Sequence, residues 1–318
     1  MYGIGTITRK ELADHFSSYR FIILFALIAM VSLITVYMVG MHIREELEGI
    51  AKPKFVFLML FTSSGALFSM VQFVALFGPL IGLILGFDSI NRERNEGTLS
   101  KLLSQPIYRD VVINGKFLAG LITIAVMLAS ILLVVTGLGL SIVGVVPGIE
   151  EFWRIFVYLI ISIIYVSFWL GVSILFSILF RNVATSALAA LAVWIFFSFF
   201  ISLGASIVAD SLMSKQGEQG TEAILQRAKI IRAVTLTSPM ELYNNATATI
   251  IDPTRRTARS IVAMGPMERL SISRFAGPLS LTQSIYVVIP YIITLVAITA
   301  ICFAVSYTVF MRQEIRSL

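Results

Sequence analysis

The chain alternates between long apolar runs and shorter polar connections. Six segments within these runs reach the roughly 20 residues that an α-helix needs to cross a bilayer. They are residues 21–41, 65–87, 117–143, 155–180, 183–208 and 284–310. Residues 55–64 precede the second crossing, and we expect them to lie at the membrane interface or to extend that helix outward. The pattern predicts an all-α polytopic membrane protein with six transmembrane helices.

The main polar segments are residues 1–20, a charged loop at 88–116, an insert at 209–283 and a tail at 311–318. In residues 1–20, apolar and charged side chains separate onto opposite helical faces, as in a helix that lies on a membrane surface. The apolar face holds Ile4, Ile7, Leu12, Phe16 and Tyr19, and the charged face holds Arg9, Lys10, Glu11 and Asp14. The alternative is a simple flanking segment.

The insert at 209–283 has helical patterns of its own. Residues 221–234 place Ile224, Ala228 and Ile231 on one face. Ser238-Pro239-Met240-Glu241 has the form of a capping box with proline at the first helical position. Leu242, Tyr243 and Ala246 would face inward from the helix that follows. We expect a small helical cap packed over the outer ends of the spans, and a formal glycosylation sequon lies at 245–247.

Composition supports the membrane assignment and orients the chain. Hydrophobic residues make up 58 % of the chain and charged residues 13 %, with a mean hydropathy of +0.92; soluble domains carry about 25 % charge. The short loops on one side hold eleven Lys and Arg residues, against four on the other. The positive-inside rule then places both termini and the loop 88–116 in the cytoplasm. We expect the protein to lie in the plasma membrane. The long insert is expected outside, since long loops translocate largely regardless of charge.

The loop 88–116 contains a short amphipathic helix set among charges. Gly97 and Thr98 open it, with Thr98 as a candidate N-cap, and Pro106 closes it. Leu99, Leu102 and Leu103 share one helical face. A helix this short is only marginally stable in water, so we expect another protein to pack against it.

The predicted spans contain no Asp, Glu, Lys, Arg or His, which argues against a proton-coupled carrier or a charge-gated channel. In the second span, Gln72 either faces a transport pathway or bonds to a neighbouring helix. Pro79 is predicted to kink this helix. Gly82 and Gly86 form a G-x-x-x-G motif of the kind that lets helices pack closely.

Catalytic and cofactor motifs are missing from the sequence. It has no G-x-x-x-x-G-K-[ST], H-E-x-x-H or G-x-S-x-G pattern. Only two histidines and one cysteine are present, so we expect no metal site and no cofactor in this chain. The chain is expected not to be an enzyme.

Several segments resemble the permeases of ABC-2 type ABC transporters. The resemblance is carried by RERNEGTL at 92–99, LLSQP at 102–106 and GKF at 115–117, with support from RKEL at 9–12 and FMRQEIR at 310–316. The closest branch includes the permease for nitrous-oxide-reductase maturation. Two pieces of the insert, at 238–243 and 252–253, are similar to those of archaeal relatives, although the insert is larger than in compact members.

The resemblance implies a permease that forms a homodimer and binds two copies of a separate ATPase. The ATP and Mg belong to that ATPase. Residues 1–20 would be the amphipathic elbow helix, and the helix after Gly97 would be the coupling helix. Leu99, Leu102 and Leu103 would seat in a groove of the ATPase, and Glu93 and Glu96 would pair with its basic residues or cap a neighbouring helix. Gly97 would permit a sharp turn. Most relatives export their cargo.

Other functions remain open at this point. A membrane-anchored receptor or assembly subunit would work through its outer insert and use the spans as anchors. A secondary carrier or channel would need ionisable groups in its spans. A neighbouring ATPase gene distinguishes the ABC permease from the receptor or assembly subunit. An extracytoplasmic partner bound by the insert is compatible with either function.

Overall fold

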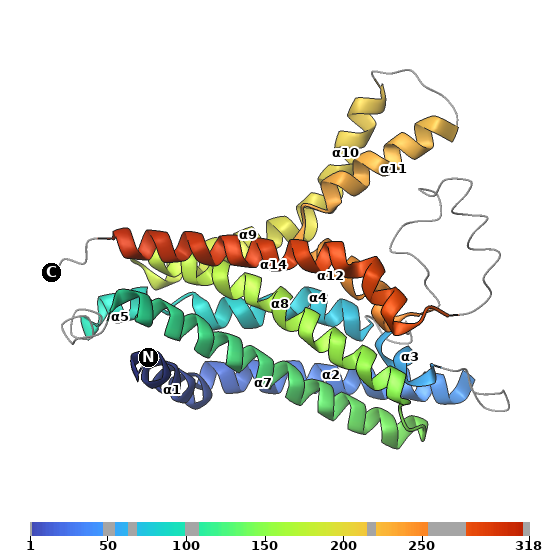
Figure 1. Cartoon of the computed structure of the whole chain (residues 1–318), viewed down its shortest axis with the longest axis horizontal. Helices are drawn as coiled ribbons and strands as arrows, with labels where there is room; N and C mark the ends of the chain where they lie inside the picture. Colours follow the sequence, from blue (N-terminus) through green and yellow to red (C-terminus); the bar gives the residue numbers. More distant parts are fainter. Residues whose placement is uncertain are drawn as a thin grey trace.

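The computed structural model describes residues 2–46, 55–62, 69–98, 108–214, 221–253 and 278–313. Every regular element within these ranges is helical (Figure 1). Six helices are long and apolar enough to cross a membrane, which confirms the all-α fold and the six predicted spans. The spans are α2 (Tyr19–Glu46), α4 (Met70–Gly86), α7 (Arg109–Val143), α8 (Ile149–Leu179), α9 (Val183–Ile195, continued by a π-helix) and α14 (Leu281–Arg312).

The shorter helices lie around this bundle (Figure 1). They are α1 (Tyr2–Ser17), α3 (Val56–Thr62), α5 (Asn91–Asn95), the π-helix η1 (Phe196–Phe200), α10 (Ile201–Ser214), α11 (Thr221–Thr235) and α12 (Pro239–Ile251). The start of α1, α5 and the carboxyl end of α14 lie at the same end of the bundle (Figure 1). Polar contacts connect these elements at that end.

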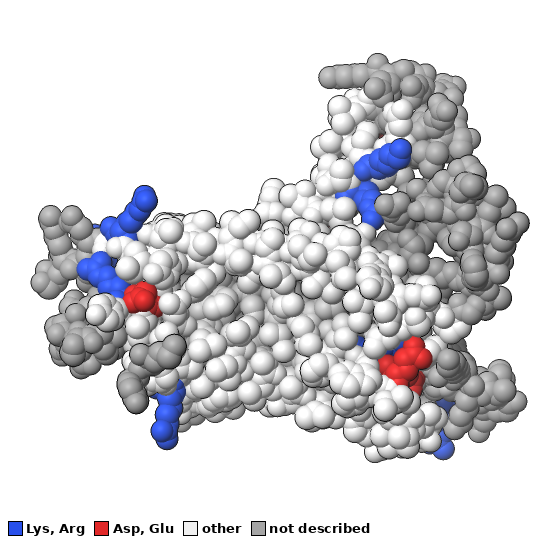
Figure 2. All heavy atoms as spheres, in the orientation of Figure 1, with Lys and Arg blue, Asp and Glu red and all other residues white. Residues whose placement is uncertain are grey.

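Charged side chains mark the two ends of the bundle. On the face shown in Figure 2, the described Lys, Arg, Asp and Glu residues gather at these ends and on the hairpin of α10 and α11. The surface between the ends is uncharged. This band is what a membrane-spanning bundle requires, since a charge exposed to hydrocarbon costs several kcal/mol, about 2.5–3.5 on insertion scales.

Two spans begin earlier than their apolar runs. Helix α7 starts at Arg109 rather than at residue 117, and α8 starts at Ile149 rather than at 155. Helix α7 therefore includes Lys116, and α8 includes Arg154. The prediction that the spans contain no ionisable group is wrong for these two helices. Both side chains are buried and ion-paired within the described structure. Pairing is what makes a charge tolerable near the membrane.

The second apolar run divides into two helices instead of extending α4 outward. Ser69 is the N-cap of α4, and its hydroxyl accepts a hydrogen bond from the backbone N–H of Gln72. The Gln72 side chain in turn accepts from the Ser69 N–H at 3.1 Å. This reciprocal capping box starts α4 at Met70. Gln72 therefore caps its own helix, which is neither of the two roles predicted for it. Helix α4 continues without a break through Pro79.

The G-x-x-x-G motif brings α4 against α8. A Cβ atom on Gly82 would lie 2.6 Å from the Val166 carbonyl oxygen and 2.7 Å from the Leu170 nitrogen. One on Gly86 would lie 2.8 Å from Ser173 Cβ. Only glycine allows this approach of the two backbones. The predicted close packing is confirmed, and its partner is a helix of the same chain.

The fifth span leaves the bundle part-way along its length. Helix α9 passes into the π-helix η1 at Phe196, and α10 then diverges and forms a projecting hairpin with α11 (Figure 1). A π-turn changes the direction of a helix because it adds a residue to one turn. The predicted helix at 221–234 is confirmed as α11. Helix α10 extends past the expected end at 208 to Ser214.

Helix α12 packs along α8 and α14 instead of covering their outer ends. Its predicted inward residues are buried, and the Tyr243 ring stacks on Tyr165 at 4.5 Å between centroids. The Tyr243 hydroxyl shares a 2.9 Å hydrogen bond with Ser162. Ser238 is the N-cap, but its hydroxyl donates to the Phe197 carbonyl, so the predicted capping-box bond is not made. Within the sequon at 245–247, Ala246 and Thr247 are fully buried and Asn245 is partly buried.

Candidate functional site

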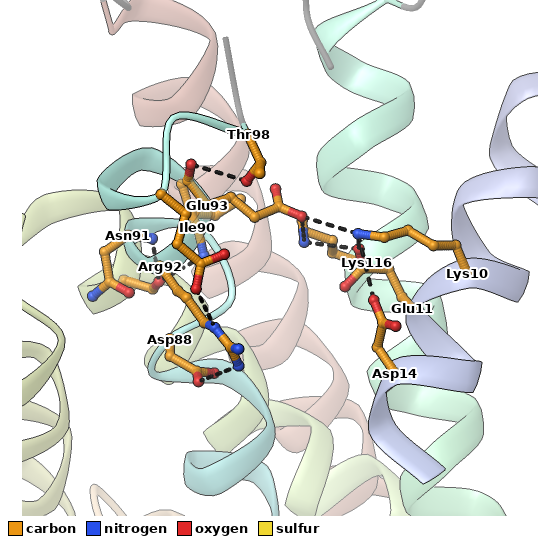
Figure 3. Close-up of polar contacts among 12 residues, drawn as sticks. Lys10, Glu11, Asp14, Asp88, Ile90, Asn91, Arg92, Glu93, Thr98 and Lys116 are labelled. Atoms are coloured by element: carbon orange, nitrogen blue, oxygen red, sulfur yellow. Dashed lines mark hydrogen bonds and ion pairs between the residues drawn. The ribbon is translucent and has the colours of Figure 1, made fainter. Parts of the chain in front are cut away.

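An ion-paired cluster joins three helices at the end of the bundle where α5 lies. The Lys116 ammonium on α7 lies 3.0 Å from Oε1 of Glu11 on α1 and 3.0 Å from Oε1 of Glu93 on α5 (Figure 3). Lys10 adds contacts to Glu11 at 3.1 Å and to Glu93 at 3.3 Å. The Lys116 side chain is only 4 % exposed, whereas that of Lys10 is 52 % exposed. Lys116 is therefore the centre of the cluster.

Close packing of α1 on α7 brings these charges together. Gly115 leaves space for Ile7, because a Cβ atom there would lie 2.7 Å from Ile7 Cγ2. Thr8 donates a hydrogen bond to the Gly115 carbonyl at 3.4 Å. Ile7, Thr8 and Glu11 form the buried side of α1. Glu11 thus turns toward the protein, and its assignment to a solvent-facing charged side is wrong.

The electrostatics of the cluster favour the charged forms of Lys10 and Glu11. Burial alone would raise the pKa of Glu11, but Lys116 and Lys10 outweigh it and lower that pKa. Burial acts to lower the pKa of Lys10, and the carboxylates of Glu11 and Glu93 reverse this and raise it. Burial lowers the pKa of His15, which lies beside the cluster. At neutral pH Lys10 and Glu11 are therefore charged.

Helix α5 is held on its other side by the end of α8. The backbone N–H groups of Ile90 and Asn91 both donate to Ser177 Oγ, at 2.9 and 3.2 Å. Asn91 is fully buried and donates from Nδ2 to the Phe87 carbonyl. These bonds satisfy N–H groups at the amino end of α5, which a short helix cannot pair internally.

Gln313, directly after α14, bonds to three elements. We call α5, the ion-paired cluster around it and the bonds that hold it to α8 and Gln313 the junction. Its backbone carbonyl accepts from Arg109 Nη1 at 2.9 Å, and its side-chain amide donates to the Ile178 carbonyl at 2.9 Å. Its side-chain oxygen accepts a hydrogen bond from Arg94 on α5. Asn95 donates to the Arg181 carbonyl at 3.1 Å. Helix α5 is thus connected to α1, α7, α8 and α14.

The predicted site residues divide into those in this junction and those outside the described residues. Glu93 bonds to Lys10 and Lys116 of its own chain. Glu96 pairs with Arg92 at 2.9 Å, and its side chain is 52 % exposed. Gly97 has a φ of 70°, a left-handed conformation that suits glycine, and the turn there is exposed. Thr98 donates its hydroxyl to the Glu93 carbonyl at 3.1 Å.

Four residues of the predicted docking helix lie outside the residues that the structure describes. These are Leu99, Leu102, Leu103 and Pro106. Sequence reasoning missed Lys116, Ser177 and Gln313 as parts of the junction. Lys116 and Gln313 lie in two segments that carry the resemblance, GKF at 115–117 and FMRQEIR at 310–316, whereas Ser177 had no signal.

A second buried charge lies near the opposite end of α8. Arg154 is fully buried and donates to the Thr249 and Ile250 carbonyls at 3.2 and 3.0 Å, the last turn of α12. It also bonds to Ser284 and to the Leu279 carbonyl, and it pairs with Glu150 at 3.0 Å. A cation at a helix carboxyl end is favoured by the helix dipole. Arg154 therefore fastens α12 to α8 and to the start of α14.

The described residues hold no group of three or more His, Cys, Asp and Glu side chains placed to bind a metal ion. The fold and the junction define a multi-pass helical membrane protein whose spans converge on one ion-paired short helix. The chain belongs to the ABC-2 family: the family described as "ABC-2 family transporter protein" matches residues 5–315. No curated protein matches the chain. The protein is thus a membrane permease of an ABC transporter, and permeases of this family typically work with an ABC ATPase subunit.

Proposed function

We propose that this chain is the membrane subunit of an ATP-driven exporter and that a separate ATPase drives it from the end of the bundle where α5 lies. The ATPase docks on the segment after Gly97 through Leu99, Leu102 and Leu103. ATP and Mg belong to that partner, and this chain has no catalytic activity of its own. The docking end and both termini face the cytoplasm, and the insert faces outward across the plasma membrane.

The observation that carries this proposal is the way α5 is held. On one side Glu93 is ion-paired to Lys116 and Lys10. On the other side Ile90 and Asn91 bond to Ser177, and Arg94 bonds to Gln313. A short helix with so many fixed contacts moves together with the helices that it contacts. A push from the ATPase on the following segment would therefore reach α1, α7, α8 and α14 as a rigid-body movement.

A second copy of the chain is the proposed partner within the membrane. Large apolar side chains stand exposed on η1 and α10, among them Phe200 at 57 %, Leu203 at 64 % and Ile207 at 68 %. They lie where the fifth span leaves the bundle (Figure 1). A homodimer formed through this surface covers them. A cysteine introduced at Leu203 in a Cys302→Ser background should then cross-link two copies, whereas one at Leu133, exposed on α7, should not.

Association with an ATPase is the direct test. The detergent-solubilised protein is purified together with the products of its neighbouring genes, and ATPase activity is assayed in the purified fraction. We expect a nucleotide-binding subunit to co-purify and to be lost in Leu102→Glu, which places a charge on the docking face. Leu102→Met is the matched control, since it keeps an apolar side chain of similar volume, and it should retain the subunit.

The two outcomes separate the functions that the sequence left open. Loss of the ATPase in Leu102→Glu alone, with normal membrane insertion, supports a permease that couples through this segment. Purification of the wild-type chain without any ATPase contradicts the proposal. Vesicles containing the complex, with ATP supplied on one side, would give the direction of transport.

A further inference from the structure

A cavity of about 560 Å³ lies between α1, the start of α2, the end of α4 and α5. Its size falls within the roughly 300–1,000 Å³ that is typical of ligand sites. One part of the wall is apolar, with Phe21 in the first turn of α2 and Ile84 and Leu85 in the last turn of α4. The rest of the wall is polar or charged. The cavity therefore lies where a membrane span ends, at the depth of lipid head groups.

Two arginines of the wall have unused hydrogen-bond donors. Arg20 Nη1 lies 2.7 Å from Asp88, and Arg92 Nε lies 2.9 Å from Glu96, with a longer contact from Arg92 Nη1 to Asp88 at 3.9 Å. Their side chains are 57 % and 58 % exposed. A guanidinium has five N–H donors in a fork that matches a phosphate group. Arg20 and Arg92 can therefore donate hydrogen bonds to a phosphodiester that lies between them.

Two polar atoms beside the cavity lack a partner. Glu93 Oε1 bonds to both lysines, whereas Glu93 Oε2 is buried without a hydrogen bond (Figure 3). Ser89 Oγ is likewise buried and unpaired. Both residues line the cavity. Each of the two atoms is an unused acceptor in a residue of the cavity wall.

The wall of the cavity carries charged side chains of both signs. Five acidic and four basic residues among the described ones line the cavity, so its formal charge is −1 with His15 neutral. An anionic phosphate alone could pair with the basic side chains only. A ligand that carries both a phosphate and an ammonium has no net charge and can pair with both kinds of side chain.

We propose that this cavity binds the head group of a phospholipid with a primary ammonium, of the phosphoethanolamine type. Arg20 and Arg92 hold the phosphodiester, the ammonium donates to Glu93 Oε2 and Ser89 Oγ, and the acyl chains pass along Phe21, Ile84 and Leu85. The bound lipid connects α1 and α2 to α5. A phosphocholine group fits less well because its quaternary nitrogen has no N–H to donate.

The proposal can be tested on the full-length subunit without any ATPase. The purified protein is delipidated in detergent, and binding of dioleoyl phosphatidylethanolamine, phosphatidylglycerol and phosphatidylcholine is measured by native mass spectrometry. We expect phosphatidylethanolamine to bind about tenfold more tightly than phosphatidylcholine, the difference that one charge-assisted hydrogen bond makes. Arg20→Gln and Ser89→Ala should each weaken its binding. Arg9→Gln removes an exposed arginine of α1 that does not line the cavity, and it should leave binding unchanged.

Several results would overturn the lipid site. They are equal affinity for phosphatidylethanolamine and phosphatidylcholine, unchanged binding in Ser89→Ala, or an equal loss in Arg20→Gln and Arg9→Gln. Free O-phosphoethanolamine that competes as well as the lipid would assign the cavity to soluble phosphate compounds instead. Ser89→Ala keeps the ion pairs intact, so the test does not depend on whether Arg20→Gln folds. Since no ATPase is present, failure here leaves the proposed transport function untouched.

Discussion

The Lys116 ammonium lies 3.0 Å from the Glu93 carboxylate and connects the beginning of α7 to α5. The same ammonium reaches Glu11 on α1, so one buried cation holds two carboxylates from two other helices. Removing one member of a buried ion pair leaves the other charge uncompensated, which costs about 3–5 kcal/mol. The junction should therefore be far more sensitive to Lys116 than to the charges around it.

Lys116→Met should destabilise the protein by about 3–5 kcal/mol, because Glu11 and Glu93 then lose their buried cation and keep only the half-exposed Lys10 between them. Lys10→Met is the control: its side chain is 52 % exposed, and the expected cost is at most about 1 kcal/mol. Unfolding in mixed micelles titrated with SDS measures both. Adding Glu11→Gln to Lys116→Met should recover part of the loss. Equal costs for the two lysine variants would show that Lys116 is not the centre of the cluster.

Gly82→Ala should destabilise the contact between α4 and α8. The new Cβ would lie 2.6 Å from the Val166 carbonyl oxygen, and a backbone atom cannot rotate away as a side chain can. The expected cost is about 1–3 kcal/mol. Gly137→Ala on α7 is the matched control, because nothing lies within 4 Å of its added Cβ. That change should stabilise its helix by about 0.5–1 kcal/mol, and a loss of stability there would contradict this account.

Arg154→Met should release α12 from its place beside α8. The change leaves the last carbonyls of α12 without the guanidinium that bonds to them at 3.0–3.2 Å. Hydrogen–deuterium exchange over residues 239–251 should increase strongly, while exchange over α5 stays as in the wild type. Glu150→Gln is the control, since this partially exposed side chain keeps an acceptor for Arg154. Unchanged exchange in Arg154→Met would mean that apolar contacts alone hold α12.

The sequence predicted those parts of the fold that depend on local pattern. The apolar runs predicted six spans, and the pattern around Pro239 predicted the start of α12 and its buried residues Leu242 and Tyr243. Helix starts at Arg109 and Ile149 were missed because helices continue past the apolar run into charged residues. The π-turn at Phe196–Phe200 was missed for a different reason: it lies inside the apolar run, and no polar or helix-breaking residue marks where it begins or ends.

The junction could be predicted only in part, because its contacts are distant in sequence. Thr8 and Gly115 are 107 residues apart, and Arg94 and Gln313 are 219 apart. Glu93 was identified from a resemblance, and its lysine partners become evident only when α1 packs on α7. The motif of Gly82 and Gly86 predicted a close contact, but no local pattern specifies that α8 is the partner. Tertiary packing decides such pairings.

His15 should make the docking of α1 sensitive to mild acid. Burial lowers the pKa of His15 from its ordinary value of 6.5; Lys116 lowers it further, and Glu11, Asp88 and Asp14 oppose the shift. When α1 is docked, the imidazole therefore stays neutral at a pH where a released α1 takes up a proton. Docking loses stability as pH falls from about 6.5 toward 5, because proton uptake favours the released state. Glu11 contributes in a separate window below its ordinary value of 4.5, since its pKa is also lowered.

Hydrogen–deuterium exchange over α1 at pH 7.5 and 5.5, corrected for the intrinsic pH dependence of exchange, measures this effect. In the wild type, protection of residues 2–17 should fall at the lower pH. His15→Gln has no titratable imidazole, so its protection should be the same at both values. A similar loss in the two proteins would assign the sensitivity to the carboxylates of the cluster. The histidine would then be a structural residue of α1 with no part in its pH response.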